Sequence, residues 1–172
     1  LYSANPNFLL SYTWHGAPVN KPISDTNYAM NLATVQELTG WQAAGITEFQ
    51  LYDYGNYFYP DTPYFWFFHQ TDYLKTFHNQ WGFRRNVGEH DNSFESSPVA
   101  YNLRAQCYWD VDTHYPDFIR DFCTRFYGSG AEEMFEYHMF MERQQLESEI
   151  WEQPDAALQS LYLADYSVAV ME

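Results

Sequence analysis

The stretch "ITEFQLYDYG", residues 46–55, decides the fold. Its apolar and polar side chains alternate, which is the period of two that a β-strand imposes on a segment with one buried face. The alternation predicts a strand over residues 46–54, with Phe49, Leu51 and Asp53 on one face. An ionisable side chain therefore follows two core residues at the end of this strand.

Segments of strand-like and helix-like character alternate on both sides of this stretch. Strands that alternate with helices indicate βαβ units built around a parallel sheet, so the fold class predicted for residues 1–110 is α/β. The strands are expected at about 8–14, 46–54 and 82–90.

The pattern changes after Trp109. The apolar residues Tyr115, Phe118, Ile119 and Phe122 recur at the spacing of one helical face. This spacing predicts an all-helical C-terminal domain over residues 111–172.

Composition excludes several classes of function. The chain has 172 residues and a net charge of −15 with eight Lys and Arg, so it should repel nucleic-acid phosphates. No apolar run is long enough to span a membrane. Ten acidic residues and one basic residue follow position 130, which indicates a solvated helical face. Cys107 and Cys123 are expected to be core thiols, although a disulfide between them stays open.

The ends of the three predicted strands carry polar groups beside aromatic residues. In parallel α/β sheets, ligands bind beyond the carboxyl ends of the strands, so these groups should converge on one site. The strand ends are Trp14-His15, Tyr52-Asp53-Tyr54 and Glu89-His90-Asp91.

Asp53 and Glu89 are the candidate catalytic carboxylates. Glycoside hydrolysis uses two carboxyl groups, one as an acid and the other as a base or nucleophile. The structural alternative is that Asp53 stabilises a turn and that Glu89 pairs with Arg84 or Arg85.

The aromatic residues near Asp53 suit a sugar ligand, since aromatic rings pack against the C–H faces of a pyranose and tyrosine hydroxyls also form hydrogen bonds. The alternative is that any single tyrosine only fills the core. The candidate substrate-binding residues are Trp14, His15, Tyr52, Tyr54, Tyr57, His90 and Asp91.

A metal-dependent enzyme that uses His15, Glu89 and His90 is a weaker alternative. The sequence contains no HExxH motif and no pair of histidines at i, i+4, so no metal is expected. It also contains neither a glycine-rich phosphate loop nor a GxSxG nucleophile motif, and no cofactor is expected.

Several motifs together resemble one family. They are a "YDY…N…P" segment after a strand, a "G…GE" strand that ends at Glu89, and "YNLRAQCYWDVDTHYPDFIRDFCTRFYG", residues 101–128. The chain resembles, over about residues 41–142, a bacterial family of uncharacterised, glycoside-hydrolase-like barrel proteins similar to α-glucuronidase and β-hexosaminidase barrels. One departure is His90, where the family usually has Gln.

The resemblance implies the last strands of a (β/α)₈ barrel, followed by the helical domain. It also implies a carbohydrate substrate and an extracytoplasmic location, periplasmic or secreted. Such a barrel needs about 250 residues. The chain has three predicted strands, which predicts either a piece of a longer chain or a partner chain that completes the barrel. The start at Leu1 without Met favours the piece of a longer chain.

Two functions from different classes remain open. The first is an enzyme, the C-terminal portion of a glycoside hydrolase that degrades a polysaccharide or oligosaccharide. The second is a carbohydrate-binding or assembly protein without catalysis. The separation of the Asp53 and Glu89 carboxyl groups would discriminate between them, since much beyond about 10 Å they cannot flank one glycosidic bond.

Overall fold

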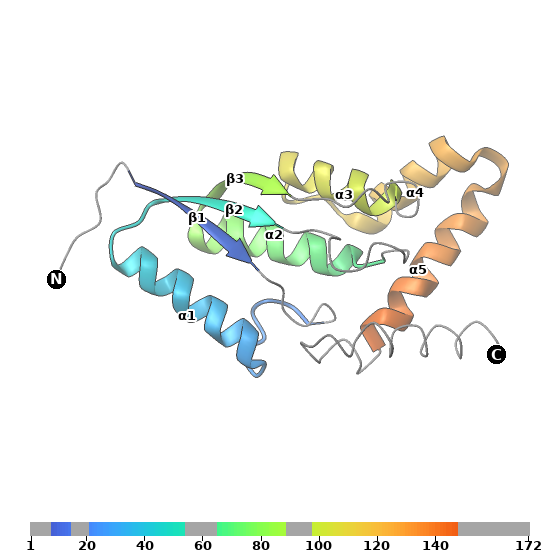
Figure 1. Ribbon diagram of the computed structural model, residues 1–172. Coiled ribbons are helices and arrows are strands. Elements are labelled where there is room, and N and C mark those ends of the chain that lie inside the picture. Colours follow the sequence, from blue (N-terminus) through green and yellow to red (C-terminus); the bar gives the residue numbers. More distant parts are fainter. Residues whose placement is uncertain (1–7, 15–20, 54–64, 89–97, 148–172) are drawn as a thin grey trace.

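The computed structural model describes residues 8–14, 21–53, 65–88 and 98–147 (Figure 1). Its strands and helices alternate as the sequence predicts, and then give way to consecutive helices. In chain order the elements are β1 (Leu9–Trp14), α1 (Ala29–Ala43), β2 (Glu48–Asp53), α2 (Phe67–Trp81), β3 (Phe83–Gly88), α3 (Pro98–Trp109), α4 (Tyr115–Tyr127), the short 3-10 helix η2 (Gly128–Gly130) and α5 (Ala131–Glu147).

The three strands form one parallel sheet in the order β1-β2-β3. Trp14 pairs with Asp53, and Asp53 pairs with Gly88, so all three strands end at the same level. The ladder between β2 and β3 shifts register between Phe49 and Gln50. The parallel sheet predicted from the alternating pattern is therefore confirmed.

The predicted partial (β/α)₈ barrel is wrong. In the described part of the chain the sheet has three strands and stays open, and the fold is a small α/β domain with helices packed against it. A barrel requires enough tilted and staggered strands to close the sheet on itself. The strand–helix alternation is common to open sheets and barrels, so it does not specify closure.

The two faces of β2 have the environments that its alternation predicts. Phe49, Leu51 and Asp53 are buried, whereas Glu48 is exposed and Tyr52 is half-buried. Helix α2 packs against the buried face. The ring centroids of Phe77 and Phe83 lie 5.1 Å apart in a stacked arrangement across this layer.

Helix α2 ends at Gly82, which adopts a left-handed φ of 74°. Glycine is favoured in this conformation because it has no Cβ to clash with the backbone. The left-handed residue turns the chain sharply, and β3 begins at the next residue. Gly82 alone therefore connects α2 to β3.

Helix α1 packs beside α2 and next to β1. The Tyr12 hydroxyl on β1 donates to the Glu37 carboxylate at 3.0 Å. The Trp81 indole donates to the Thr39 hydroxyl at 3.4 Å. The fully buried Leu38 lies between these contacts in sequence and anchors α1 to the core.

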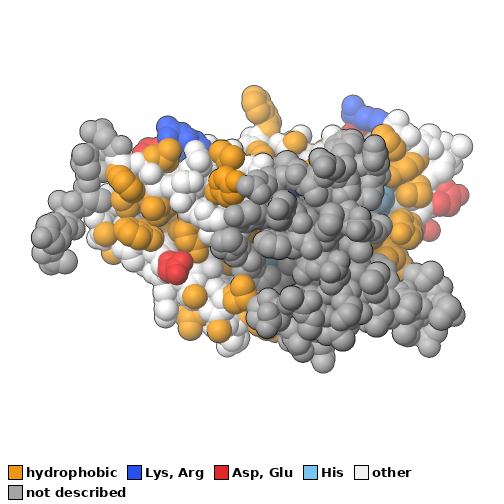
Figure 2. Space-filling view, viewed as in Figure 1, with side chains coloured by type: hydrophobic (Ala, Val, Ile, Leu, Met, Phe, Trp, Pro, Cys, Tyr) orange, Lys and Arg blue, Asp and Glu red, His pale blue; other side chains and the backbone are white. Residues whose placement is uncertain are grey.

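Helices α4 and α5 pack against each other and extend the hydrophobic core of the sheet. Ile119 and Cys123 on the predicted apolar face of α4 are fully buried and belong to the same core cluster as the strands. Cys107 and Cys123 are both buried free thiols, as expected. Figure 2 shows apolar atoms gathered over the α4–α5 end of the domain, where Phe126 and Phe140 are exposed.

Candidate functional site

The carboxyl edge of the sheet holds a buried polar cluster centred on Asp53, the last residue of β2. Asp53 is 4% exposed. The Tyr73 hydroxyl donates to Oδ2 at 2.5 Å, and the Tyr108 hydroxyl donates to the same oxygen at 3.2 Å. The Arg104 Nε lies 3.7 Å from Oδ2, so a buried ion pair joins β2 to α3.

Among the described residues, helices α2 and α3 supply the other polar side chains of this Asp53 cluster, and β1 supplies Trp14. Tyr73 follows His69 by four residues on α2, and Tyr108 follows Arg104 by four residues on α3. Residues four apart lie on the same face of a helix, so each pair points to the sheet together. The cluster therefore forms where the two helices pack side by side behind the strand end.

Gln70 links the two helices within the cluster. With its amide oriented to satisfy both neighbours, its nitrogen donates to the Ala100 carbonyl at 3.2 Å. In the same orientation its oxygen accepts from Arg104 Nη2 at 3.2 Å. Gln70 is 1% exposed and Arg104 is 4% exposed. The guanidinium is thus held in place by a carboxylate on one side and an amide on the other.

The ionisation of the cluster follows from its burial. Burial alone would lower the pKa of Arg104, but the electrostatic influence of Tyr73 and Asp53 outweighs it and raises this pKa. Burial, and then the Asp53 charge, raise the pKa of Tyr73 and of Tyr108. The guanidinium therefore stays charged and both hydroxyls stay protonated, so that they act as donors to Asp53.

His69 is a neutral member of this cluster. Burial lowers its pKa to about 3; the Asp53 charge has a smaller raising effect, and the Arg104 charge lowers the pKa further. Its Nδ1 is buried without a hydrogen-bond partner among the described residues. Its ring stacks on Trp14 at a centroid distance of 5.2 Å. A buried polar atom of this kind requires a partner, such as a ligand or an ordered water.

Trp14, the last residue of β1, forms the apolar side of the cluster. It is 5% exposed, and its ring centroid lies 4.5 Å from that of Tyr73 and 5.4 Å from that of Phe77. The indole Nε1 is also buried with no partner in the part of the chain that the structure describes. Trp14 is therefore part of the hydrophobic core at the carboxyl edge of the sheet.

The structure brings together two of the residues predicted from the sequence and separates a third. Trp14 and Asp53 are register partners at the ends of β1 and β2 and share Tyr73 as a neighbour. Tyr52 lies on the opposite face of β2. Six predicted residues lie outside the described ones: His15, Tyr54, Tyr57, Glu89, His90 and Asp91.

Sequence reasoning missed the helical half of the cluster. The signal was present as polar side chains four residues apart, His69 with Tyr73 and Arg104 with Tyr108. On an amphipathic helix such pairs normally belong to the solvated face. Only the packing of α2 against α3 shows that these pairs face the sheet instead.

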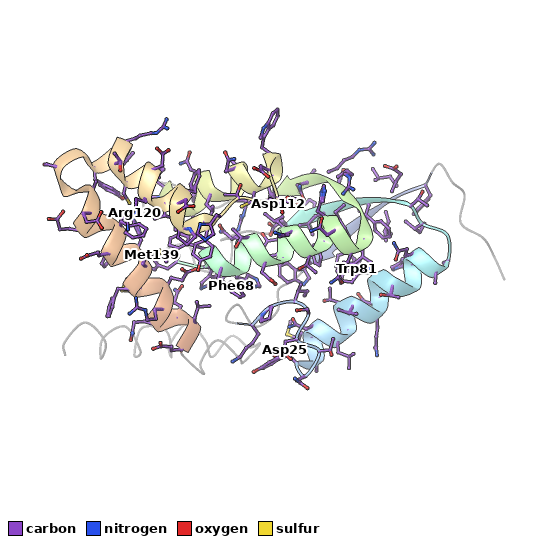
Figure 3. All side chains as sticks on the ribbon, turned by 180° about the vertical axis from the view of Figure 1, so that it is seen from behind. Asp25, Phe68, Trp81, Asp112, Arg120 and Met139 are labelled. Carbon is purple, nitrogen blue, oxygen red and sulfur yellow. The ribbon has the colours of Figure 1, made fainter. Side chains whose placement is uncertain are left out.

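A second buried carboxylate, Glu142 on α5, lies at the beginning of α2. It is 2% exposed, and its Oε1 accepts a hydrogen bond from the Phe68 backbone N–H at 2.6 Å. Figure 3 shows Phe68 at the start of α2 beside α5, the helix that carries Met139. Burial raises the pKa of Glu142 to about 7, although hydrogen bonds from Phe68, Tyr115 and Phe67 act in the opposite direction.

His138 lies one helical turn before Glu142 on α5. It is 8% exposed, and burial lowers its pKa to about 4. Both ring nitrogens are buried without a hydrogen-bond partner among the described residues. The rings of Phe65 and Tyr137 each lie 5.7 Å from its ring centroid. The His138 imidazole is therefore a neutral polar group among aromatic rings, on the face of α5 that covers the start of α2.

The described ranges contain neither a metal-ligand cluster nor a membrane-spanning helix. No group of three or more His, Cys, Asp or Glu side chains there is placed to hold a metal ion. The alternative site of His15, Glu89 and His90 lies outside those ranges. None of the described helices has the length and hydropathy to cross a bilayer.

No protein-family model, curated protein or solved structure matches this chain. The glycoside-hydrolase-like resemblance of its sequence therefore stays a prediction.

Proposed function

We propose that the protein binds carbohydrate at the carboxyl edge of its sheet. One observation carries the proposal: the parallel strands end in register at Trp14, Asp53 and Gly88, beside a buried polar cluster. This is the edge at which parallel α/β sheets bind ligands.

The sequence next to this edge has the composition of a sugar site. The segment 54–64, which directly follows β2, contains five aromatic residues among eleven, four of them tyrosines. Tyrosine combines an apolar ring with a hydrogen-bonding hydroxyl, as the C–H faces and hydroxyls of a sugar require. The Asp53 cluster is buried at the end of β2, directly before this segment in the chain.

Binding without hydrolysis is the function that the geometry supports best. Asp53 is buried, paired with Arg104 and bonded to two tyrosine hydroxyls through Oδ2. A general acid or base must reach the proton that it transfers, and these contacts direct Asp53 into the protein. Its role in the proposal is to hold α2 and α3 against the strand end.

Glycoside hydrolysis with Glu89 as the acid/base group is the second candidate. It is favoured by the lowered pKa of His69, which lies beside the buried Asp53–Arg104 ion pair. Ionisable groups with perturbed pKa values cluster at active sites. In this form of the proposal Asp53 positions the site, and the second reacting carboxylate comes from elsewhere.

A glycan array followed by calorimetry with the best oligosaccharide tests the proposal. Tyr54→Ala combined with Tyr57→Ala should weaken binding about tenfold, given about 0.5–1.5 kcal/mol for each stacked aromatic. Tyr137→Ala, at a half-exposed position on α5, is the matched control and should bind as the wild type does. Absence of binding to every glycan would refute the proposal.

Release of reducing ends from the bound oligosaccharide distinguishes the two candidates. Binding without release supports the binding function. Release that Glu89→Gln abolishes, while binding persists, supports the hydrolase. Release that persists in Glu89→Gln excludes Glu89 as the acid/base group.

A further inference from the structure

The two outer strands of the sheet, β1 and β3, each have one edge along which the described part of the chain places no further strand. Such an edge presents backbone N–H and C=O groups that can pair with another strand. Proteins usually protect a free edge with charged side chains, prolines or bulges. The two edges of this sheet differ in that protection.

The β3 edge is protected by charge. Arg84 and Arg85 are both exposed on this strand of six residues. Pairing two copies of β3 would gather four guanidinium groups at one short interface, and like charges across paired strands are destabilising. We therefore expect β3 to stay unpaired between copies of the chain.

The β1 edge has no such protection. Residues 8–14, "FLLSYTW", contain no charged residue, no proline and no glycine. Aromatic and β-branched residues of the kind found there favour the strand conformation. Phe8 is 52% exposed and Leu9 is 37% exposed. An uncharged strand with exposed apolar side chains at a free edge is suited to pairing with another strand.

Helix α1 adds an exposed aromatic residue beside this edge. Glu37 accepts the Tyr12 hydroxyl bond from β1, and Trp41 lies four residues later on the same face of the helix. The Ile46 backbone N–H donates to the Trp41 carbonyl at 3.1 Å, just before β2 begins, so Trp41 lies at the end of the sheet where β1 also begins. Trp41 is 47% exposed. Figure 2 shows hydrophobic side chains gathered at this end of the domain.

The side chains of β1 are compatible with pairing to an identical strand. In an antiparallel pair centred on Ser11, Leu9 of one copy lies opposite Thr13 of the other. In the same register Leu10 lies opposite Tyr12. Opposed residues point to the same face of a sheet, so the helix-covered face of one copy continues into that of the other. None of these pairs brings like charges together.

We propose that β1 pairs with β1 of a second copy of this chain, which gives a two-fold symmetric dimer with one continuous sheet. Phe8 and Trp41 of each copy flank the paired strands and become covered. A second copy is the partner that fits, because β1 carries no charge that would attract or orient a foreign charged segment, and a two-fold axis needs only one self-complementary surface.

The net charge of the chain makes a distinctive prediction about this dimer. Each copy carries a charge of −15, so long-range repulsion opposes association although the interface itself is uncharged. Salt screens this repulsion, so the dimer should be reversible and should become tighter as the salt concentration rises. A complex held by opposite charges would respond to salt in the opposite direction.

Sedimentation equilibrium of the wild-type protein tests the proposal, over a roughly hundredfold range of concentration at low and at high salt. The average mass should rise from 20.5 kDa toward twice that value, and more steeply at high salt. A mass that stays at 20.5 kDa under all conditions would overturn the inference. So would a rise that salt reverses, or one that continues beyond the dimer. None of these outcomes bears on the proposed carbohydrate binding.

Two lysine variants identify the strand that pairs. Ser11→Lys places two like charges opposite each other at the two-fold axis and should weaken the dimer by about tenfold or more. Val87→Lys, at an exposed position of β3, is the matched control and should dimerise as the wild type does. Circular dichroism establishes that both variants are folded. If Val87→Lys dissociates the dimer and Ser11→Lys does not, the interface is not β1.

A second pair of variants leaves β1 unchanged, so it decides the question even if Ser11→Lys does not fold. Trp41→Ala should weaken the dimer several-fold. Leu32→Ala is the control, because Leu32 is 39% exposed but lies nine residues away, about half a turn around α1. Equal dimerisation of these two variants and the wild type would remove Trp41 from the interface and contradict the proposed arrangement.

Discussion

Asp53 and Glu142 are both buried carboxylates, but they are stabilised in different ways. Asp53 lies beside the full positive charge of Arg104 and accepts two tyrosine hydroxyl bonds. Glu142 lies at the beginning of α2 and accepts a backbone N–H, and the described residues provide no ion-pair partner for it. Each carboxylate joins α2 to a different part of the fold.

The difference shows how much counter-charge a buried carboxylate needs in order to stay ionised at neutral pH. A helix N-terminus carries a partial charge of roughly half a unit, which does not offset the loss of hydration. The pKa of Glu142 accordingly rises from an ordinary value of 4.5 to about 7. Asp53 has a complete counter-charge. Replacing the carboxylate by an amide should therefore lower the stability of the fold at Asp53, whereas at Glu142 it should remove the loss of stability that occurs as the pH rises.

Asp53→Asn should cause the largest loss of stability. It leaves the buried Arg104 charge without its partner, which costs about 3–5 kcal/mol. Urea unfolding at pH 7 measures the change. The matched control is Asp121→Asn, which removes an exposed pair with Arg125 and should cost less than about 1 kcal/mol.

The double variant Asp53→Asn with Arg104→Met sharpens this test. It removes both charges together, so it should be more stable than Asp53→Asn alone. If Asp53→Asn costs no more than Asp121→Asn, the ion pair does not hold the strand end to α3.

Glu142→Gln should change the pH dependence of stability. Because its pKa is raised in the folded state, Glu142 stabilises the fold below pH 4.5, and this contribution is lost as the pH rises through about 7. The wild type should lose up to about 3 kcal/mol from this group over that range, while Glu142→Gln should lose none of it. Unfolding midpoints from pH 5 to pH 8 measure the difference between the two proteins.

The exposed Glu133→Gln on the same helix is the control for this series. It should retain the wild-type profile. Burial of His69 and His138 makes stability fall in the opposite direction, toward acid, so the comparison between variants isolates Glu142. A profile of Glu142→Gln that coincides with that of the wild type would show that its carboxyl group titrates normally.

The smallest effects are expected from the two tyrosines that bond to Asp53. Tyr73→Phe should cost about 1–3 kcal/mol, because Tyr73 is 2% exposed and its bond to a charged acceptor is 2.5 Å long. Tyr108→Phe should cost less, because Tyr108 is half-buried and its bond is 3.2 Å long. Thermal unfolding of both variants measures the order. The reverse order would mean that Tyr108 is the main donor.

The sequence alone predicts the strands because their signal is local. Alternation along β2 requires no knowledge of the rest of the chain, and it correctly places Phe49, Leu51 and Asp53 on the buried face. Closure of the sheet is a global property, and no local pattern distinguishes an open sheet of βαβ units from part of a barrel. The barrel was implied by the family resemblance, and the local pattern could neither support it nor exclude it.

The same limit applies to the polar residues. The acidic composition after position 130 indicates a solvated helical face, which holds for the exposed Glu132 and Glu133. Glu142 is an exception because it meets the start of a helix 74 residues earlier in the chain. Arg104 likewise is recognisable as a buried cation only when its partner on β2 is known.

The bond from Glu142 to Phe68 also has a consequence for the order of folding. The sheet and its helices form from neighbouring segments, whereas this bond closes a loop of 74 residues and cannot form until α5 docks. The first turn of α2 should therefore be completed late. The Phe68 amide would then exchange its hydrogen whenever α5 detaches, and its exchange rate would report the lifetime of that docked state.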